Sequence, residues 1–186
     1  LANNRYPCPA AGNLAEGNAN YGVEAASCLA SSCPSGMFCG TRSVRGVIPF
    51  VTLGLPNNFG SDDFNSKISY AIDHSFAIKN GNCESSGGLI IKDINNNTMT
   101  DTAVYAVISH GKTKAGAYDA RTTNYYSCIT GQADGENCNS NDTFLDSTIN
   151  DLATNTAQLY DDIIIWSLNP KRKTCPAGLR DCRLWL

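Results

Sequence analysis

Oxygen-bearing side chains that could bind a cation are concentrated in two short segments of the sequence. We predict a calcium loop from the first segment, formed by Asp134, Glu136, Asn139 and Asp142. The second segment is similar in character and contains Asp93, Asn95, Asn97 and Asp101. Calcium takes about six to eight oxygen ligands, which alternate residues of a loop can supply. The EF-hand pattern is absent, and an Asx-rich turn that binds no metal is the alternative reading.

Hydrolytic chemistry would need a nucleophile, a base and an acid, and the sequence offers few candidates. Ser109 and His110 are adjacent at the end of an expected strand, where neighbours point to opposite faces, so they cannot activate each other. Asp73-His74 is expected to be a solvent-exposed strand end. The acidic pairs Asp62-Asp63 and Asp161-Asp162 are expected to start turns or cap elements. A Gly-x-Ser-x-Gly elbow is absent, so we predict that the protein is not an enzyme.

Nine cysteines are present, and none forms a Cys-x-x-Cys pair typical of zinc sites. This pattern favours disulfides and therefore export to an oxidising compartment. Cys128–Cys138 and Cys175–Cys182 are predicted to close local loops, and the pairing among the four N-terminal cysteines stays open. Cys83 is expected to be the odd cysteine. The predicted disulfide cysteines are Cys8, Cys28, Cys33, Cys39, Cys128, Cys138, Cys175 and Cys182.

The composition describes one globular domain with a nearly neutral, polar surface. The chain has 186 residues, of which 42% are hydrophobic and 17% charged, and 17 acids against 14 bases give a net charge of −3. Twenty asparagines supply much of the remaining polarity. A nucleic-acid groove would require a basic stripe, which the sequence lacks. The apolar run 46–55 is too short to cross a bilayer, which needs about 20 residues.

Short apolar runs predict strands joined by long loops. Alternation predicts strands within 64–72 and 103–109, and further strands are expected at 89–91 and 163–166. Ser147 to Tyr160 is the one segment of this body that could be a helix. We expect an antiparallel sheet whose core contains Val104, Ala106, Ile108, Ile164 and Trp166, with Pro49, Phe50 and Leu53 beside it.

Several ordered segments together resemble one bacterial family. They are Cys8-Pro9-Ala10, Gly22-Val23-Glu24, Gly46-Val47-Ile48-Pro49-Phe50, Leu53-Gly54-Leu55-Pro56, Ile68 to Asp73, Val107 to Gly111, Gly116-Ala117-Tyr118 and Asp161 to Trp166. This set resembles the globular part of type IV pilin-like proteins, the prepilin-type cleavage/methylation group of minor pilins and type II secretion pseudopilins. The resemblance covers about Tyr6 to Trp166, whereas the tail 167–186 and the extra cysteines depart from the family pattern.

The resemblance implies an α+β fold, in which an antiparallel sheet packs on the C-terminal half of an N-terminal helix. It implies a single domain over 1–186, with 1–6 as the end of that helix and 167–186 as a cysteine-containing tail. It further implies a structural subunit without cofactor, held in the inner membrane by a helix absent from this sequence. Its partners would be other pilin or pseudopilin subunits, in the periplasm or in a surface filament. A secreted adhesin or carbohydrate-binding module, and less so a secreted hydrolase, are the alternatives.

Overall fold

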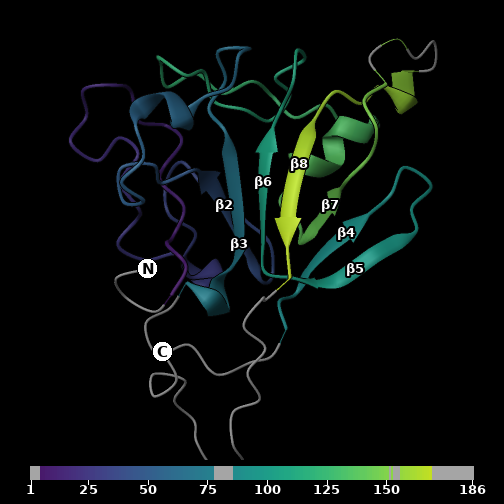
Figure 1. The fold of residues 1–186 in the computed structure, drawn as a ribbon, viewed down its shortest axis with the longest axis horizontal. Helices are drawn as coiled ribbons and strands as arrows, with labels where there is room; N and C mark the ends of the chain where they lie inside the picture. The colour runs from purple at the N-terminus through teal and green to yellow at the C-terminus, as the bar shows by residue number, and fades with distance from the viewer. Residues whose placement is uncertain (1–4, 78–85, 151, 153–155, 169–186) are drawn as a thin grey trace, which may run out of the picture.

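The fold is built on two β-sheets. The computed structural model describes residues 5–77, 86–150, 152 and 156–168. The larger sheet is antiparallel throughout, in the order β1-β2-β3-β6-β8 (Figure 1). Its strands are β1 (Phe38–Cys39), β2 (Ser43–Val47), β3 (Ser69–Asp73), β6 (Tyr105–Ser109) and β8 (Ile163–Ser167). For this sheet, the expectation of antiparallel strands joined by long, disulfide-linked loops is confirmed.

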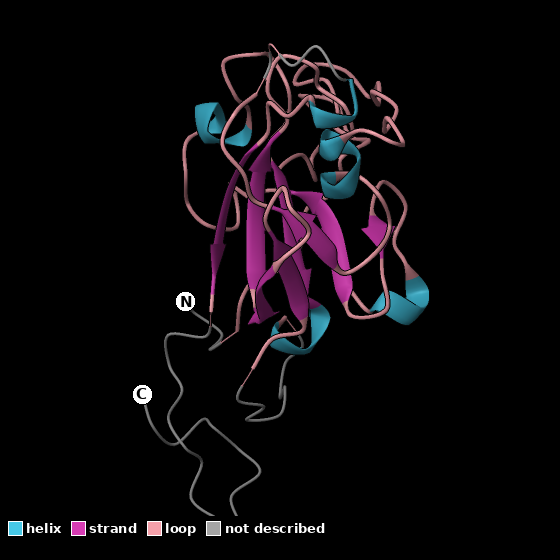
Figure 2. Ribbon diagram, turned by 90° about the vertical axis from the view of Figure 1, so that its right-hand side faces the viewer, coloured by secondary structure: helices cyan, strands magenta, loops and turns pink. Residues whose placement is uncertain are grey.

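A smaller sheet covers part of one face of the larger one. It has the order β5-β4-β7, with β4 (Leu89–Lys92), β5 (Thr98–Ala103) and β7 (Thr143–Leu145). β4 pairs with β5 antiparallel and with β7 parallel. Figure 2 shows the long connections gathered beyond one end of the strands.

The two sheets enclose an apolar core. We call the face of the larger sheet that meets the smaller sheet the inner face. Ile108 pairs directly with Ile164, and both side chains lie on this face with Ala71 and Ala106. They pack against residues of the smaller sheet: Leu89, Ile91, Ala103 and Phe144. The predicted burial of Val104, Ala106, Ile108 and Ile164 is confirmed, and Trp166 packs partly buried against this cluster.

The opposite, outer face is covered near β2 and β3 by the N-terminal segment. The Tyr6 N–H donates to the Phe76 carbonyl, and its ring lies 5.6 Å from that of Tyr105. The Tyr70 hydroxyl donates to the Pro7 carbonyl over 3.2 Å. Burial of aromatic and aliphatic groups therefore holds an irregular segment on the sheet without helical hydrogen bonds.

Disulfides fix the loops that surround this core. Three bonds are present among the described residues: Cys8–Cys28, Cys33–Cys39 and Cys128–Cys138. The local Cys128–Cys138 loop is confirmed, and the N-terminal cysteines are found to pair in chain order. Each bond stabilises by about 2–4 kcal/mol, chiefly by restricting the unfolded chain. The predictions for Cys83, Cys175 and Cys182 lie outside the described residues.

The helix content differs from the expected α+β class. All helical segments of the described chain are short 3-10 turns: η1 (Ala30–Ser32), η2 (Asn57–Gly60), η3 (His74–Phe76), η4 (Ala133–Asn137) and η5 (Thr156–Gln158). Arg5 and Tyr6 are not helical, and residues 1–4 lie outside the described chain. Asn150 bridges Tyr160, so the described part of 147–160 forms one η5 turn inside a loop rather than a helix. No helix among the described residues has the length and apolarity to span a membrane.

One core prediction needs correction. Phe50 is buried, but its ring packs edge-on against Tyr21, with centroids 5.4 Å apart. Leu53 is 38% exposed and does not belong to the core cluster. The chain turns after Pro49, and the Leu53 N–H donates back to the Pro49 carbonyl. This turn ends the apolar run before it can continue along the sheet.

Candidate metal centre

A buried polar cluster lies where β6 ends and β8 begins (Figure 1). His110 follows the last residue of β6, and Asp161 and Asp162 directly precede β8. The η4 turn, beside the start of β8, contributes Asp134. Gly111 has a φ of 54°, and a Cβ there would overlap Asp161, so only glycine allows the two segments to approach this closely.

Three carboxylates meet in this cluster. Ligand oxygens of Asp134, Asp161 and Asp162 lie within 4.8 Å of one another, and all three residues are buried. Asp134 accepts a 3.0 Å hydrogen bond from the Asp161 N–H. Thr113 donates its N–H and its hydroxyl to the two Asp161 oxygens, over 2.7 and 2.9 Å. Asn137 donates its amide to Asp162 over 2.9 Å, which leaves the other Asp162 oxygen without a partner.

His110 lies at the edge of the carboxylates and is completely buried. Its Nε2 is 2.8 Å from the Ser69 hydroxyl, and its Nδ1 is 3.8 Å from Asp162 Oδ2, too far for a hydrogen bond. Nδ1 forms no hydrogen bond. A backbone contact with Ala115 acts to raise the pKa of the imidazole. Burial, together with the nearby Arg45 charge, nevertheless lowers the pKa of His110 to about 3. The imidazole is therefore neutral at physiological pH.

The carboxylates have little positive charge to balance them. Burial is the main cause that raises the pKa of Asp162 to about 8, and the charge of Asp134 adds to it. Burial and the Asp161 charge likewise raise the pKa of Asp134 to about 6. The Arg45 charge acts to lower the pKa of Asp162, but its two terminal nitrogens donate to the carbonyls of Asn137 and Cys138. Without a bound cation, Asp162 therefore holds a proton at neutral pH.

Ser69 contacts His110 and His110 faces Asp162, which is the set of contacts found in a hydrolytic triad. A substrate could not reach these residues, because all three are buried. The distance from His110 Nδ1 to Asp162 Oδ2 is 3.8 Å, too long for a hydrogen bond. A nucleophile must reach a substrate carbonyl, which a buried hydroxyl cannot do. Ser109, the neighbour singled out in the sequence, instead donates to Asp62 over 2.7 Å. The arrangement is suited to binding and cohesion, not to acyl transfer.

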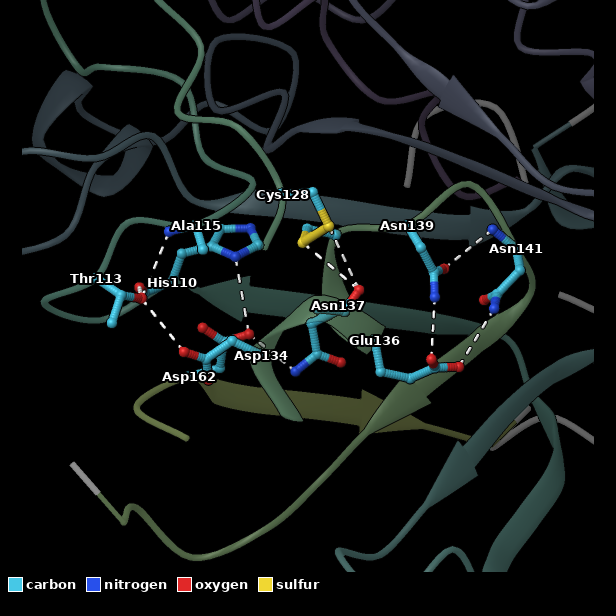
Figure 3. The surroundings of a disulfide bond; sticks show 12 residues. His110, Thr113, Ala115, Cys128, Asp134, Glu136, Asn137, Asn139, Asn141 and Asp162 are labelled. Carbon is cyan, nitrogen blue, oxygen red and sulfur yellow. Dashed lines mark hydrogen bonds and ion pairs between the residues drawn. A yellow bond between two sulfur atoms is a disulfide. The ribbon is translucent and has the colours of Figure 1, made fainter. Parts of the chain in front are cut away.

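The four residues of the predicted calcium loop are divided between three surroundings. Asp134 joins the buried cluster, whereas Glu136 points to the other side of η4 and accepts from the amides of Asn139 and Asn141 (Figure 3). Asp142 accepts from the backbone N–H groups of Arg42 and Ser43. These hydrogen bonds give the carboxylates of Glu136 and Asp142 partners within the protein.

The second oxygen-rich segment forms a closed turn. Asp93 accepts from the backbone N–H groups of Asn95 and Asn97 and from the Asn97 amide. These hydrogen bonds lower the pKa of Asp93. This is the Asx-rich turn that the sequence left open as the alternative.

Two expected strand ends are more buried than the sequence indicated. Asp161-Asp162 was expected to cap a turn, but both residues are buried in the cluster. Asp73 was expected to be exposed, but it is buried, accepts from Ser75 and pairs with Arg42 over 2.9 Å. Asp73 ends the central strand β3, which is buried along its whole length, so its carboxylate must find donors inside the protein. Asp161-Asp162 precedes the edge strand β8, and its burial comes from contacts with the η4 turn and Thr113 that no local pattern indicates.

Tyr125 and Tyr126 are adjacent aromatic residues of the kind that a sugar-binding patch would use, but both are half-buried and make contacts within the protein. The Tyr125 ring lies 5.0 Å from those of Phe38 and Tyr118, and Arg45 stacks over Phe38 at 4.7 Å. Tyr126 donates its hydroxyl to Asp119. None of the four aromatic rings belongs to the exposed large hydrophobic residues of the described chain.

Comparisons with protein-family models, curated proteins and solved structures find no match to this chain.

Proposed function

We propose that this chain is the exported globular body of a filament subunit, of the type IV pilus or type II secretion pseudopilus kind. Its function would be to assemble with other subunits, without catalysing a reaction. The observation that carries this proposal is an open apolar stripe on the outer face of the sheet. We define this outer-face stripe by Ile163 and Ile165 of β8, which lie beside Val107 of β6.

The two isoleucines of the outer-face stripe are exposed in the described chain, whereas Val107 beside them packs partly buried against the apolar cluster of that face. Ile163 is 51% exposed and Ile165 is 65% exposed, whereas Ile164 between them is buried on the inner face. Val107 pairs directly with Ile165, so the two side chains adjoin. Two exposed isoleucines on the same face of one strand form a contiguous apolar surface. Packing another segment against them would be favourable, because it would remove that surface from water.

We assign the stripe to an apolar helix that precedes Arg5 in the full gene product. The N-terminal segment already lies on the same face, where Tyr6 contacts Tyr105 of β6. A chain that arrives along this face reaches β6 and β8 without crossing the sheet. The helix would anchor the subunit in the inner membrane before assembly and pack among its neighbours in the filament.

Other features are consistent with this role. Three disulfides indicate an oxidising compartment outside the cytoplasm. The resemblance of the ordered motifs between Tyr6 and Trp166 supports the same family. Burial of Ser69, His110 and Asp162 argues against the hydrolase alternative, and the internal contacts of Tyr125 argue against the adhesin alternative.

The test is an assembly assay on the full gene product in its own membrane. Ile165→Asp should strongly reduce the filaments recovered by shearing, because a charge would be buried under the helix. Ile149→Asp is the matched control, since Ile149 is 55% exposed in a loop outside the sheet. Equal assembly of the two variants, or a product that is released as a soluble protein after an ordinary signal peptide, would refute the proposal and favour the adhesin reading.

A further inference from the structure

The buried cluster contains polar atoms that the protein itself does not satisfy. His110 Nδ1 and Asp162 Oδ1 are both inaccessible to solvent and have no hydrogen-bond partner. His110 Nδ1 faces Asp162 Oδ2 at 3.8 Å, and the oxygens of Asp134 and Asp161 lie beside that carboxylate. Buried polar groups in native proteins nearly always have a partner, so these atoms require an explanation.

We propose that this cluster binds one divalent cation through the oxygens of Asp134, Asp161 and Asp162, which lie within 4.8 Å of one another. His110 lies outside that trio but faces Asp162 at 3.8 Å, and a small movement of its ring toward the ion would add Nδ1 as a fourth ligand. The carboxylates supply the negative charge, and the imidazole supplies one neutral nitrogen. This inference goes beyond the proposed assembly function and does not depend on it.

The surroundings of His110 match those of a metal-bound histidine. A ligating imidazole must present a lone pair, and its other nitrogen normally donates to an outer partner that fixes the ring. Ser69 Oγ lies 2.8 Å from Nε2 and can accept that hydrogen bond. Nδ1 then keeps its lone pair and faces the Asp162 carboxylate (Figure 3). Without a cation, this lone pair would face carboxylate oxygen, which is unfavourable unless a proton lies between them.

The partners of the three carboxylates leave room for coordination. Each Asp accepts hydrogen bonds that orient it, from Thr113, from Asn137 or from the Asp161 N–H. A carboxylate oxygen has two lone-pair directions, so a held oxygen can still ligate a metal. Thr113 and Asn137 act here as outer partners that position the ligands.

The donor set selects the class of cation. Calcium prefers six to eight oxygen ligands, whereas imidazole suits first-row transition metals and carboxylates suit manganese. Three carboxylates and one imidazole therefore favour a cation of the Mn²⁺ type over calcium. Mn²⁺ is also the better probe, because it binds weakly to cysteine thiols and has a paramagnetic signal.

The experiment is Mn²⁺ titration of the chelator-treated chain, followed by electron paramagnetic resonance. We expect one saturable site, a rise in thermal midpoint on loading, and spin-echo modulation from one directly bound imidazole nitrogen. Asp162→Asn, which is nearly isosteric, should weaken binding at least tenfold, and Asp134→Asn should do the same. Asp93→Asn is the matched control, because it removes an acid from the self-satisfied turn, and it should leave binding unchanged.

Three results would each overturn the inference. The first is the absence of saturable binding at millimolar Mn²⁺. The second is Mn²⁺ binding that survives in both Asp162→Asn and Asp134→Asn, with circular dichroism showing that the variants are folded. The third is bound Mn²⁺ that lacks the imidazole nitrogen signal, which would remove His110 from the site.

Discussion

Truncation of one buried isoleucine tests the division of the larger sheet into an inner and an outer face. Ile108 is fully buried on the inner face, in the core shared with the smaller sheet. Ile108→Ala removes three carbon groups, which at about 0.8 kcal/mol each gives about 2.4 kcal/mol of lost transfer free energy. The cavity left between the two sheets adds to this, so we expect about 3–4 kcal/mol of destabilisation.

Ile165→Ala is the matched control for this measurement. It makes the same chemical change on the same sheet, but Ile165 is 65% exposed on the outer face. Its cost should stay below about 1 kcal/mol in the chain of residues 1–186, because little buried surface is lost from the core. In the full gene product, the proposed helix would cover Ile165, and the cost of its truncation should rise.

Urea unfolding with the disulfides intact supplies the assay. With a slope of about 2 kcal/mol per molar, Ile108→Ala should lower the midpoint by about 1.5–2 M. The Ile165→Ala midpoint should move by less than about 0.5 M. Equal shifts for the two variants, or an Ile108→Ala midpoint equal to the parent, would show that the inner face is not the packed core.

Three further predictions concern buried polar contacts. Glu24 is partly buried, which alone would raise its pKa, but hydrogen bonds from Arg5 and the Cys8 N–H hold that pKa below the ordinary 4.5. The stabilisation from Glu24 is therefore fully present above about pH 4.5, and it is lost as the pH falls through the lower pKa of the folded state. The thermal midpoints of the parent and of Glu24→Gln should then converge at acid pH. A gap between the two midpoints that stays constant with pH would contradict this. Lys67 donates to three backbone carbonyls, so Lys67→Met should cost at least about 2 kcal/mol in urea unfolding, and a neutral result would show that those carbonyls find other donors. Ser69→Ala removes the hydrogen-bond partner of His110 Nε2 and should lower the free energy of unfolding by about 1–3 kcal/mol, measured in urea. An unchanged urea midpoint would show that this hydrogen bond does not stabilise the cluster.

Local patterns in the sequence determined the strands and the disulfide character of this protein. Alternation from Val104 to Ile108 places every second side chain on one face, and the structure buries that face. The pairing of Cys128 with Cys138 followed from their short separation, because loop closure is easiest between near neighbours. Such features depend on residues close in the chain, so they can be read without the fold.

The polar interior was decided only by the tertiary structure. Asp161-Asp162 has the same local appearance as Asp62-Asp63, yet the first pair is buried beside Asp134 and the second lies at a partly exposed turn. No local rule distinguishes them, because burial depends on the β6–β8 pairing and on the η4 loop that closes over it.

The partners of His110 show the same limit. Its sequence neighbour Ser109 turns to another face, while Ser69 and Asp162 reach it from β3 and from the start of β8. These residues are separated by about 40 and 50 positions along the chain, and antiparallel register alone brings them together. Adjacent strand residues point to opposite faces, whereas paired residues on neighbouring strands share one, so the composition of a buried site follows from register and not from sequence proximity.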